Sequence, residues 1–95
     1  MKIHPAAAVD RLEDLPNIGN SIAGDLRSLG ILKPSDLAKR LPLDLYHQLA
    51  GVMGKRHDPC VFYTLLAVEH FLKTGESQPW WRFTREGKRL LRENA

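Results

Sequence analysis

Residues 12–31, with the sequence LEDLPNIGNSIAGDLRSLGI, constrain the fold more than any other stretch of the chain. Residues 15–19 form a short connection that contains a proline and a glycine, and apolar residues recur at helical spacing on both sides of it. On its C-terminal side they fall at i, i+4 and i+7, on one helix face: Ile22, Leu26 and Leu29. The stretch therefore predicts two short helices joined by a tight turn.

Both ends of the second helix carry residues suited to them. We expect Gly19 to take a positive φ, because a residue without a Cβ does so at little cost. Asn20 is the expected N-cap, and Gly30 is expected to follow the C-cap. Ala23 and Gly24 are small, so the two helices are expected to cross closely there.

The same stretch resembles a helix-hairpin-helix motif; its matching residues are Leu15, Pro16, Ile18, Gly19 and Ala23. The resemblance implies that backbone N–H groups of the hairpin contact nucleic-acid phosphate without reading sequence. A helix N-terminus favours an anion because its first N–H groups are unpaired and the helix dipole is positive there. The expected phosphate-binding residues are Asn17, Ile18, Gly19, Asn20 and Ser21, with Arg27 nearby.

The flank of the hairpin departs from the motif. Many DNA-repair versions carry Lys or Arg just after the glycine, whereas Asn20 and Ser21 are neutral here. The alternative interpretation is therefore an interhelical turn that packs and binds nothing.

Length and composition predict one domain over residues 1–95, with residues 1–7 as a loose N-terminal arm. No apolar run reaches the ~20 residues that span a bilayer, and the N-terminus lacks the apolar region of a signal peptide. A single cysteine cannot form an internal disulfide. We therefore expect a cytoplasmic protein that has no membrane partner.

Prolines and apolar spacing predict the other helices. The first is expected at residues 8–14, the third begins at Pro34 and the fourth at Pro42, because proline is favoured at the first helical position. The fourth is expected to end at Gly51 and Gly54. The expected inward residues of the third and fourth are Leu37, Leu41, Leu45, Leu49 and Val52.

The most apolar segment, residues 60–73, follows a strong helix start at Asp58 and Pro59. Its apolar residues surround almost the whole helical wheel, so this fifth helix is either the central core helix or half of a dimer interface. We favour the core, because the other helices are short and need something to pack on. Together these elements predict an all-α domain of five or six short helices with one helix-hairpin-helix motif.

The last helix, residues 85–93 with Thr84 as its expected N-cap, has two different faces. Phe83, Gly87, Leu90 and Leu91 share the apolar one. The opposite face is basic and carries Arg85, Lys88, Arg89 and Arg92. Residues 51–95 hold the whole positive excess of a chain with a net charge of +3. This face is either a phosphate footprint or an ordinary solvated surface.

Other chemical signals are few. His57 and Cys60 could supply two metal ligands, whereas a structural zinc site requires four. No residue pattern suggests a nucleotide site or a catalytic triad. We expect no metal, no cofactor and no enzymatic activity. Cys60 is either a reactive thiol in the first turn of a helix or, as we favour, a small apolar residue in the core. Trp80 and Trp81 either stack on unpaired bases or, as we favour, cap the core with one ring inside and one at the rim.

The resemblance extends along nearly the whole chain. The chain resembles the small bacterial proteins of the pathogenicity-locus family, which are often labelled mitomycin resistance proteins. The segments that carry this resemblance are the hairpin and then, in order, DLAKRLPLDLYHQL, KRHDPCV and QPWWRFTREGK. The start of the chain is similar to the C-terminal helical domain of competence regulators. We expect a non-sequence-specific DNA-binding module, accessory to DNA repair or uptake. The alternative is a protein-interaction module, with a protein partner or a second copy and no nucleic-acid binding.

Overall fold

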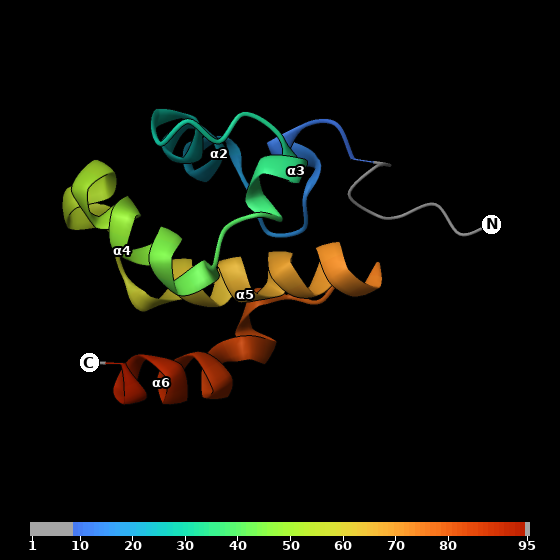
Figure 1. The fold of residues 1–95 in the computed structure, drawn as a ribbon. Coiled ribbons are helices and arrows are strands. Elements are labelled where there is room, and N and C mark those ends of the chain that lie inside the picture. The colour runs from blue at the N-terminus through green and yellow to red at the C-terminus, as the bar shows by residue number, and fades with distance from the viewer. Residues whose placement is uncertain (1–8, 95) are drawn as a thin grey trace.

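The longest helix, α5 (Pro59–Thr74), lies at the centre of the fold, and the other elements pack around it (Figure 1). This computed structural model describes residues 9–94, so the expected arm at residues 1–7 lies outside the described residues. The elements before α5 are η1 (Leu12–Asp14), α2 (Asn20–Ser28), α3 (Pro34–Leu37), α4 (Pro42–Met53) and η2 (Gly54–Arg56). Those after it are η3 (Trp80–Phe83) and α6 (Thr84–Glu93). The five α-helices confirm the all-α prediction.

Local sequence sets both ends of α5. The carboxylate of Asp58 accepts a hydrogen bond from the backbone N–H of Cys60 at 2.7 Å, which makes Asp58 the N-cap. Gly75 takes the left-handed conformation at φ 80° and ends the helix. Nine of the sixteen residues between them are buried, with Val61 to Val68 forming an unbroken run. The prediction of a central core helix is confirmed.

The C-terminus of α2 is closed by a Schellman motif. Gly30 has a φ of 86°, its N–H donates to the Arg27 carbonyl, and the N–H of Ile31 donates to the Leu26 carbonyl at 3.1 Å. The prediction for Gly30 is therefore confirmed. Ala23 is fully buried, whereas Gly24 lies on the surface with no atom within 4 Å of a Cβ built there, so only Ala23 serves close packing.

Two expectations for the first half are wrong, and both errors involve a residue before a proline. The helix expected at residues 8–14 is only the 3-10 turn η1, because Arg11 is extended and Leu15 is held extended ahead of Pro16, which leaves three residues between them. Leu41 is 65% exposed, because it is likewise extended ahead of Pro42 and leaves the buried face that Leu37 begins.

Two helix ends also differ from expectation. Helix α4 runs through Gly51 to Met53, so Met53 is buried where Val52 had been expected, and Gly54 alone ends the helix with a φ of 57°. Thr84 is the first residue of α6 and not its N-cap, because η3 runs directly into the helix.

Candidate nucleic-acid interface

The hairpin turn takes its left-handed residue at Asn17 and not at Gly19. Asn17 has a φ of 68°, which asparagine tolerates better than most residues, whereas Gly19 is extended at φ −93° and ψ 179°. Ile18 is only 5% exposed and its N–H donates to the Leu15 carbonyl. The expected role of Ile18 as an N–H donor to phosphate is therefore not available in this geometry.

The N-terminus of α2 presents free donors one residue earlier than expected. Gly19 is the N-cap, so Asn20 is the first helical residue and the prediction that it caps the helix is wrong. In the part of the chain that the structure describes, the N–H groups of Asn20, Ser21 and Ile22 have no hydrogen-bond acceptor. Gly19, Asn20 and Ser21 are exposed, so an anion can approach this helix end from solvent.

The side chain of Asn17 makes a contact that the sequence did not indicate. Its Nδ2 donates to the Gln78 carbonyl at 2.9 Å, and its Oδ1 accepts from the N–H of Trp80 at 3.3 Å. These two bonds bridge about sixty residues of chain and hold the hairpin turn against the start of η3. A lone asparagine in a turn gives no sequence signal for such a contact, because its partners are backbone groups.

A second unexpected contact ties α2 to η2. Arg56 donates to the Ser21 hydroxyl at 2.8 Å and to both carboxylate oxygens of Asp25 at 3.0 and 3.1 Å. Asp25 is buried, and its carboxylate raises the pKa of Arg56. Ser21 and Asp25 are four residues apart on one face of α2, which is the signal that a sequence reading could have used. The Ser21 hydroxyl is thus already engaged.

Arg27, expected beside the phosphate site, is engaged with a carboxylate. Its two terminal nitrogens donate to the two oxygens of Glu13 at 2.9 and 2.8 Å. The hydrogen bonds from Arg27 lower the pKa of Glu13 to about 2. This bidentate pair joins η1 to α2, so the Arg27 charge is largely neutralised by a neighbour within the hairpin.

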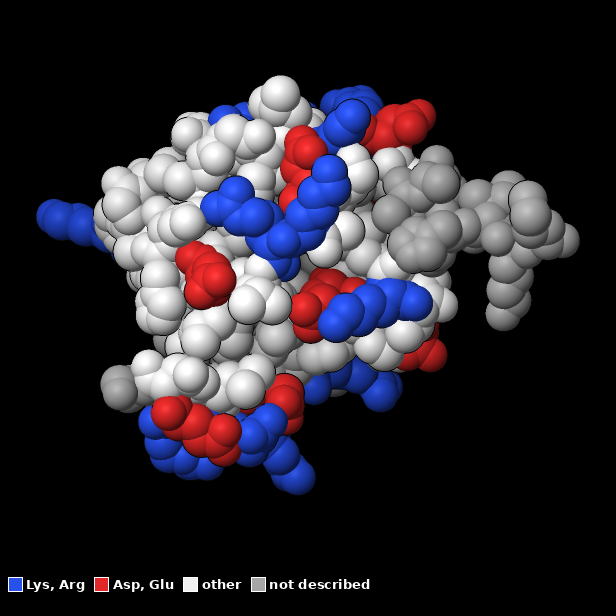
Figure 2. All heavy atoms as spheres, in the orientation of Figure 1, with Lys and Arg blue, Asp and Glu red and all other residues white. Residues whose placement is uncertain are grey.

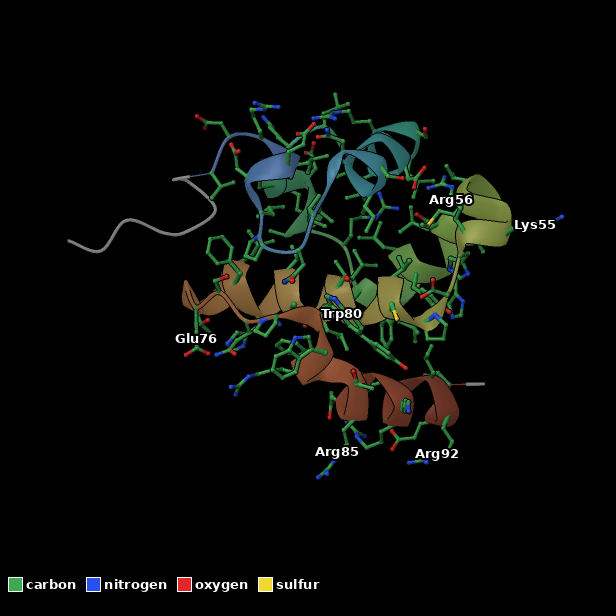
Figure 3. The ribbon with its side chains drawn as sticks, turned by 180° about the vertical axis from the view of Figure 1, so that it is seen from behind. Lys55, Arg56, Glu76, Trp80, Arg85 and Arg92 are labelled. Carbon is green, nitrogen blue, oxygen red and sulfur yellow. The ribbon has the colours of Figure 1, made fainter. Side chains whose placement is uncertain are left out.

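The basic face of α6 divides into one paired and three unpaired cations. Arg89 donates to the carboxylates of both Glu86 and Glu93, and these bonds raise its pKa. The other three, Arg85, Lys88 and Arg92, are exposed and form no ion pair within residues 9–94. Arg85 and Arg92 point away from the body of the protein on the same side of α6 (Figure 3).

In the described part of the chain, the face of the protein opposite to the one in Figure 3 carries both acidic and basic side chains and no single basic patch (Figure 2). Acidic and basic side chains are interspersed on the face shown in Figure 2, including along the lower edge where α6 lies. Lys55 and Arg56 lie on the other side of α5 from Arg85 and Arg92 (Figure 3). The unpaired cations of α6 therefore form a separate contact surface from the basic residues of η2.

The adjacent tryptophans have different environments. The ring of Trp80 stacks on Tyr63 of α5, with ring centroids 6.4 Å apart and an interplanar angle of 14°. Trp81 is 58% exposed, and the Arg82 guanidinium lies 5.7 Å from its ring centroid. Trp80 is partly buried against the core and Trp81 lies at the rim, so the predicted difference between the rings is present although neither ring is fully inside.

Cys60 fits neither of its two expected descriptions. The residue is exposed, so the expectation of a cysteine packed in the core is wrong. Partial desolvation of the thiol, followed by its hydrogen bond to Asp58 and the charge of that carboxylate, raises the pKa of Cys60, which opposes a reactive thiolate. His57 does not turn toward it, because its Nε2 lies 2.7 Å from the Tyr46 carbonyl oxygen.

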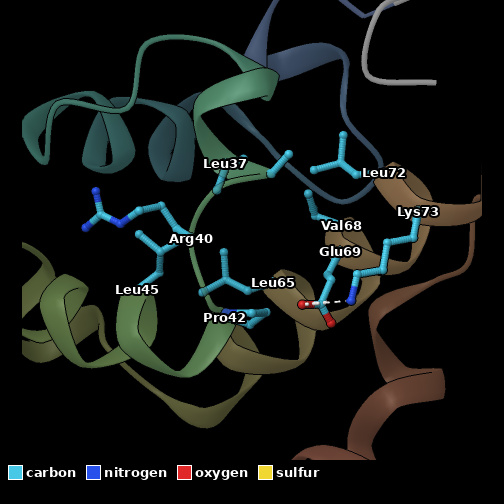
Figure 4. Close-up of a pocket in the computed structure, with 10 residues that line it drawn as sticks. Leu37, Arg40, Pro42, Leu45, Leu65, Val68, Glu69, Leu72 and Lys73 are labelled. Atoms are coloured by element: carbon cyan, nitrogen blue, oxygen red, sulfur yellow. Dashed lines mark ion pairs between the residues drawn. The ribbon is translucent and has the colours of Figure 1, made fainter. Parts of the chain in front are cut away.

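An apolar hollow of about 330 Å³ lies between α3, α4 and α5 (Figure 4). Its walls include Leu37, Leu45, Leu65, Val68 and Leu72, and its charged residues are Arg40, Glu69 and Lys73. Lys73 and Glu69 pair with each other at 3.6 Å. Exposed Leu41 lines a smaller neighbouring hollow that shares Pro42 and Glu69 with this one. The two hollows together form a largely apolar concave surface beside α5.

No helix among residues 9–94 is long and apolar enough to cross a membrane. Nor do these residues bring together three or more His, Cys, Asp or Glu side chains that could hold a metal ion.

Comparisons with known proteins agree with one another. The sequence model of the family described as "Pathogenicity locus" matches residues 5–89. The chain is 35% identical over 80 residues to the "Mitomycin resistance protein McrB" of Streptomyces lavendulae, a match that covers 84% of this chain and 76% of that relative. No solved structure matches the chain.

Proposed function

The chain belongs to the pathogenicity-locus family, and from that premise we propose that it is a DNA-binding module that contacts backbone phosphate without reading base sequence. The observation that carries the proposal is the set of three unpaired cations on α6: Arg85, Lys88 and Arg92. Cations that no carboxylate neutralises are available to replace the counterions of a phosphate backbone. We propose no catalytic step, and a cytoplasmic role accessory to DNA repair or uptake, as the resemblance to helix-hairpin-helix proteins implies.

The hairpin supplies a second proposed contact. We treat η1, the turn and α2 as a helix-hairpin-helix with a shortened first helix, in which the N–H groups of Asn20 and Ser21 meet a phosphate. Asn17 supports this contact indirectly by holding the turn in place. Arg27 and Arg89 contribute less than the sequence suggested, because each already pairs with carboxylates of the protein.

Binding of a 20-base-pair duplex measured across a salt series tests this proposal. We expect a dissociation constant of ~10⁻⁴–10⁻⁶ M at physiological salt, with affinity falling steeply as salt rises. Replacing Arg85, Lys88 and Arg92 together by Ala should make the slope of log K against log salt shallower by about 2–3, since each lost phosphate contact removes ~0.9. Arg89→Ala is the matched control and should change the slope much less. Failure of the duplex to bind even at low salt would reject the proposal.

A substitution at the hairpin separates its contact from that of α6. Asn20→Glu places a carboxylate in the first turn of α2, where it suits the helix dipole and leaves the fold intact, but repels phosphate. We expect weaker duplex binding with an unchanged or raised melting temperature. Unchanged binding would restrict the DNA contact to α6.

The apolar hollows favour the second candidate function, a protein-interaction module in which a second copy of the chain covers exposed Leu41. Sedimentation equilibrium distinguishes the two candidates. The interaction hypothesis requires a dimer that Leu41→Asp converts to folded monomers, because a charge on this exposed side chain disturbs an interface and not the core. A wild-type monomer up to high micromolar concentration, together with salt-dependent DNA binding, would reject it.

A further inference from the structure

The exposed ring of Trp81 has no packing role to explain it. Its neighbour Trp80 stacks on Tyr63, and the backbone N–H of Trp80 donates the hydrogen bond to Asn17 that fixes η3 to the hairpin turn, so these structural contacts of the pair are made by Trp80. Trp81 keeps 58% of its surface exposed and has only the Arg82 guanidinium over its face. An exposed aromatic ring offers a face on which an unpaired base can stack.

Trp81 lies at one end of the unpaired cations of α6. Arg85, Lys88 and Arg92 are spaced at i, i+3 and i+7 on one side of α6, and Trp81 lies in η3, which runs directly into the start of that helix. Arg85 and Arg92 are separated by about 10 Å along the axis at 1.5 Å per residue. We call these four residues the α6 ridge. Its three cations span a length that corresponds to about three nucleotides at ~3.4 Å per nucleotide of one strand.

We propose that the α6 ridge binds single-stranded DNA, with an unpaired base stacked on Trp81 and the following phosphates on Arg85, Lys88 and Arg92. This inference rests on the proposed DNA-binding function and adds the substrate class. Inside a duplex the faces of the bases are covered by their neighbours, so a protein ring can stack only on a base that is unpaired or terminal. Cations along a backbone track together with an aromatic platform are the combination that single-strand binding proteins use.

The bonds of Asn17 hold the hairpin turn against residues 78–80, beside the start of η3, which carries Trp81. The N-terminus of α2 lies elsewhere, because Ser21 contacts Arg56, which is across α5 from Arg85 and Arg92 (Figure 3). The α6 ridge and the hairpin are therefore separate contact surfaces, and a single strand on the ridge does not depend on the hairpin contact.

Fluorescence anisotropy with two labelled probes, a 12-nucleotide oligothymidine and a 12-base-pair blunt duplex, tests the inference at one low salt concentration. Trp81→Ala should weaken binding of the single strand by about tenfold or more, the loss expected for one stacked base, and change duplex binding less than twofold. Trp81→Phe keeps an aromatic face and should restore most of the single-strand affinity. Because Trp81 is exposed, both variants are expected to fold, which circular dichroism verifies.

The outcomes separate this inference from the function on which it rests. Duplex binding with no effect of Trp81→Ala on the single strand would overturn the inference and leave the DNA-binding proposal standing. Equal weakening of both probes would also overturn it, since the ring would then contribute to DNA binding in general. If neither probe binds the wild-type protein, both proposals fail together.

Discussion

At the scale of single residues, the carboxylates beside an arginine or cysteine side chain determine its free charge or its reactivity more than its position in a sequence motif does. Arg27 and Arg89 look like free cations in the sequence, but both are paired with carboxylates. Arg27 pairs with Glu13 of the preceding η1, and Arg89 pairs with two glutamates of its own helix. Cys60 has the position of an activated thiol at a helix start, yet the same Asp58 that caps the helix raises the pKa of the thiol. The capping residue and the deactivating residue are one side chain.

The first prediction concerns this pair. Folded protein should react with iodoacetamide without denaturant, because Cys60 is exposed, but slowly at pH 7, with a rate that still rises above pH 9. Asp58→Asn keeps an N-cap of equal quality while removing the negative charge, so it should speed alkylation at pH 8. A rate that levels off below pH 7, or no reaction until the protein is unfolded, would contradict the assignment.

At the scale of elements, the contact of α6 with α5 depends on one small residue. Gly87 is buried, and a Cβ built on it would overlap Cδ1 and Cε1 of Tyr63, whose ring is itself buried. Leu90 and Leu91 pack beside it at the edge of the core. The absent side chain at residue 87 lets the otherwise polar helix α6 lie close to α5 and keeps its basic face outward.

Two glycine substitutions test this contact with opposite expected signs. Gly87→Ala should destabilise the protein by about 1–3 kcal/mol, because the added methyl group forces the Tyr63 ring to move. Gly24→Ala is the matched control in the exposed interior of α2, where nothing lies within 4 Å, and should stabilise by ~0.5–1 kcal/mol. Urea unfolding measures both. Stabilisation by both changes would show that helix propensity outweighs the contact with Tyr63.

At the scale of the whole molecule, the hairpin and the C-terminal segment lie on either side of α5 in sequence but meet through the hydrogen bonds of Asn17. Arg56 makes a similar connection between η2 and α2 through Asp25. These long-range polar contacts position the surfaces that the proposals use, while the apolar residues of α5 hold the fold together.

Substitutions at Asn17 measure this long-range connection. Asn17→Ala loses both hydrogen bonds and puts alanine at a φ of 68°, so we expect a loss of about 2–3 kcal/mol in the free energy of unfolding. Asn17→Gly loses the bonds but accepts the backbone conformation, and should cost about 1 kcal/mol. The difference between the variants reports backbone strain, and a neutral Asn17→Gly would show that the two bonds add no stability.

The sequence by itself determined the helical class, the central place of α5 and several helix ends, because these depend on periodicity and on local capping at Asp58, Gly30 and Gly75. It also predicted that the two tryptophans differ. Tertiary structure decided that Arg27 pairs with Glu13, that Arg56 pairs with buried Asp25, and that Asn17 bonds to residues 78–80. These contacts depend on side chains and backbone groups that different segments of the chain bring together, and the spacing of residues along one helix does not indicate them.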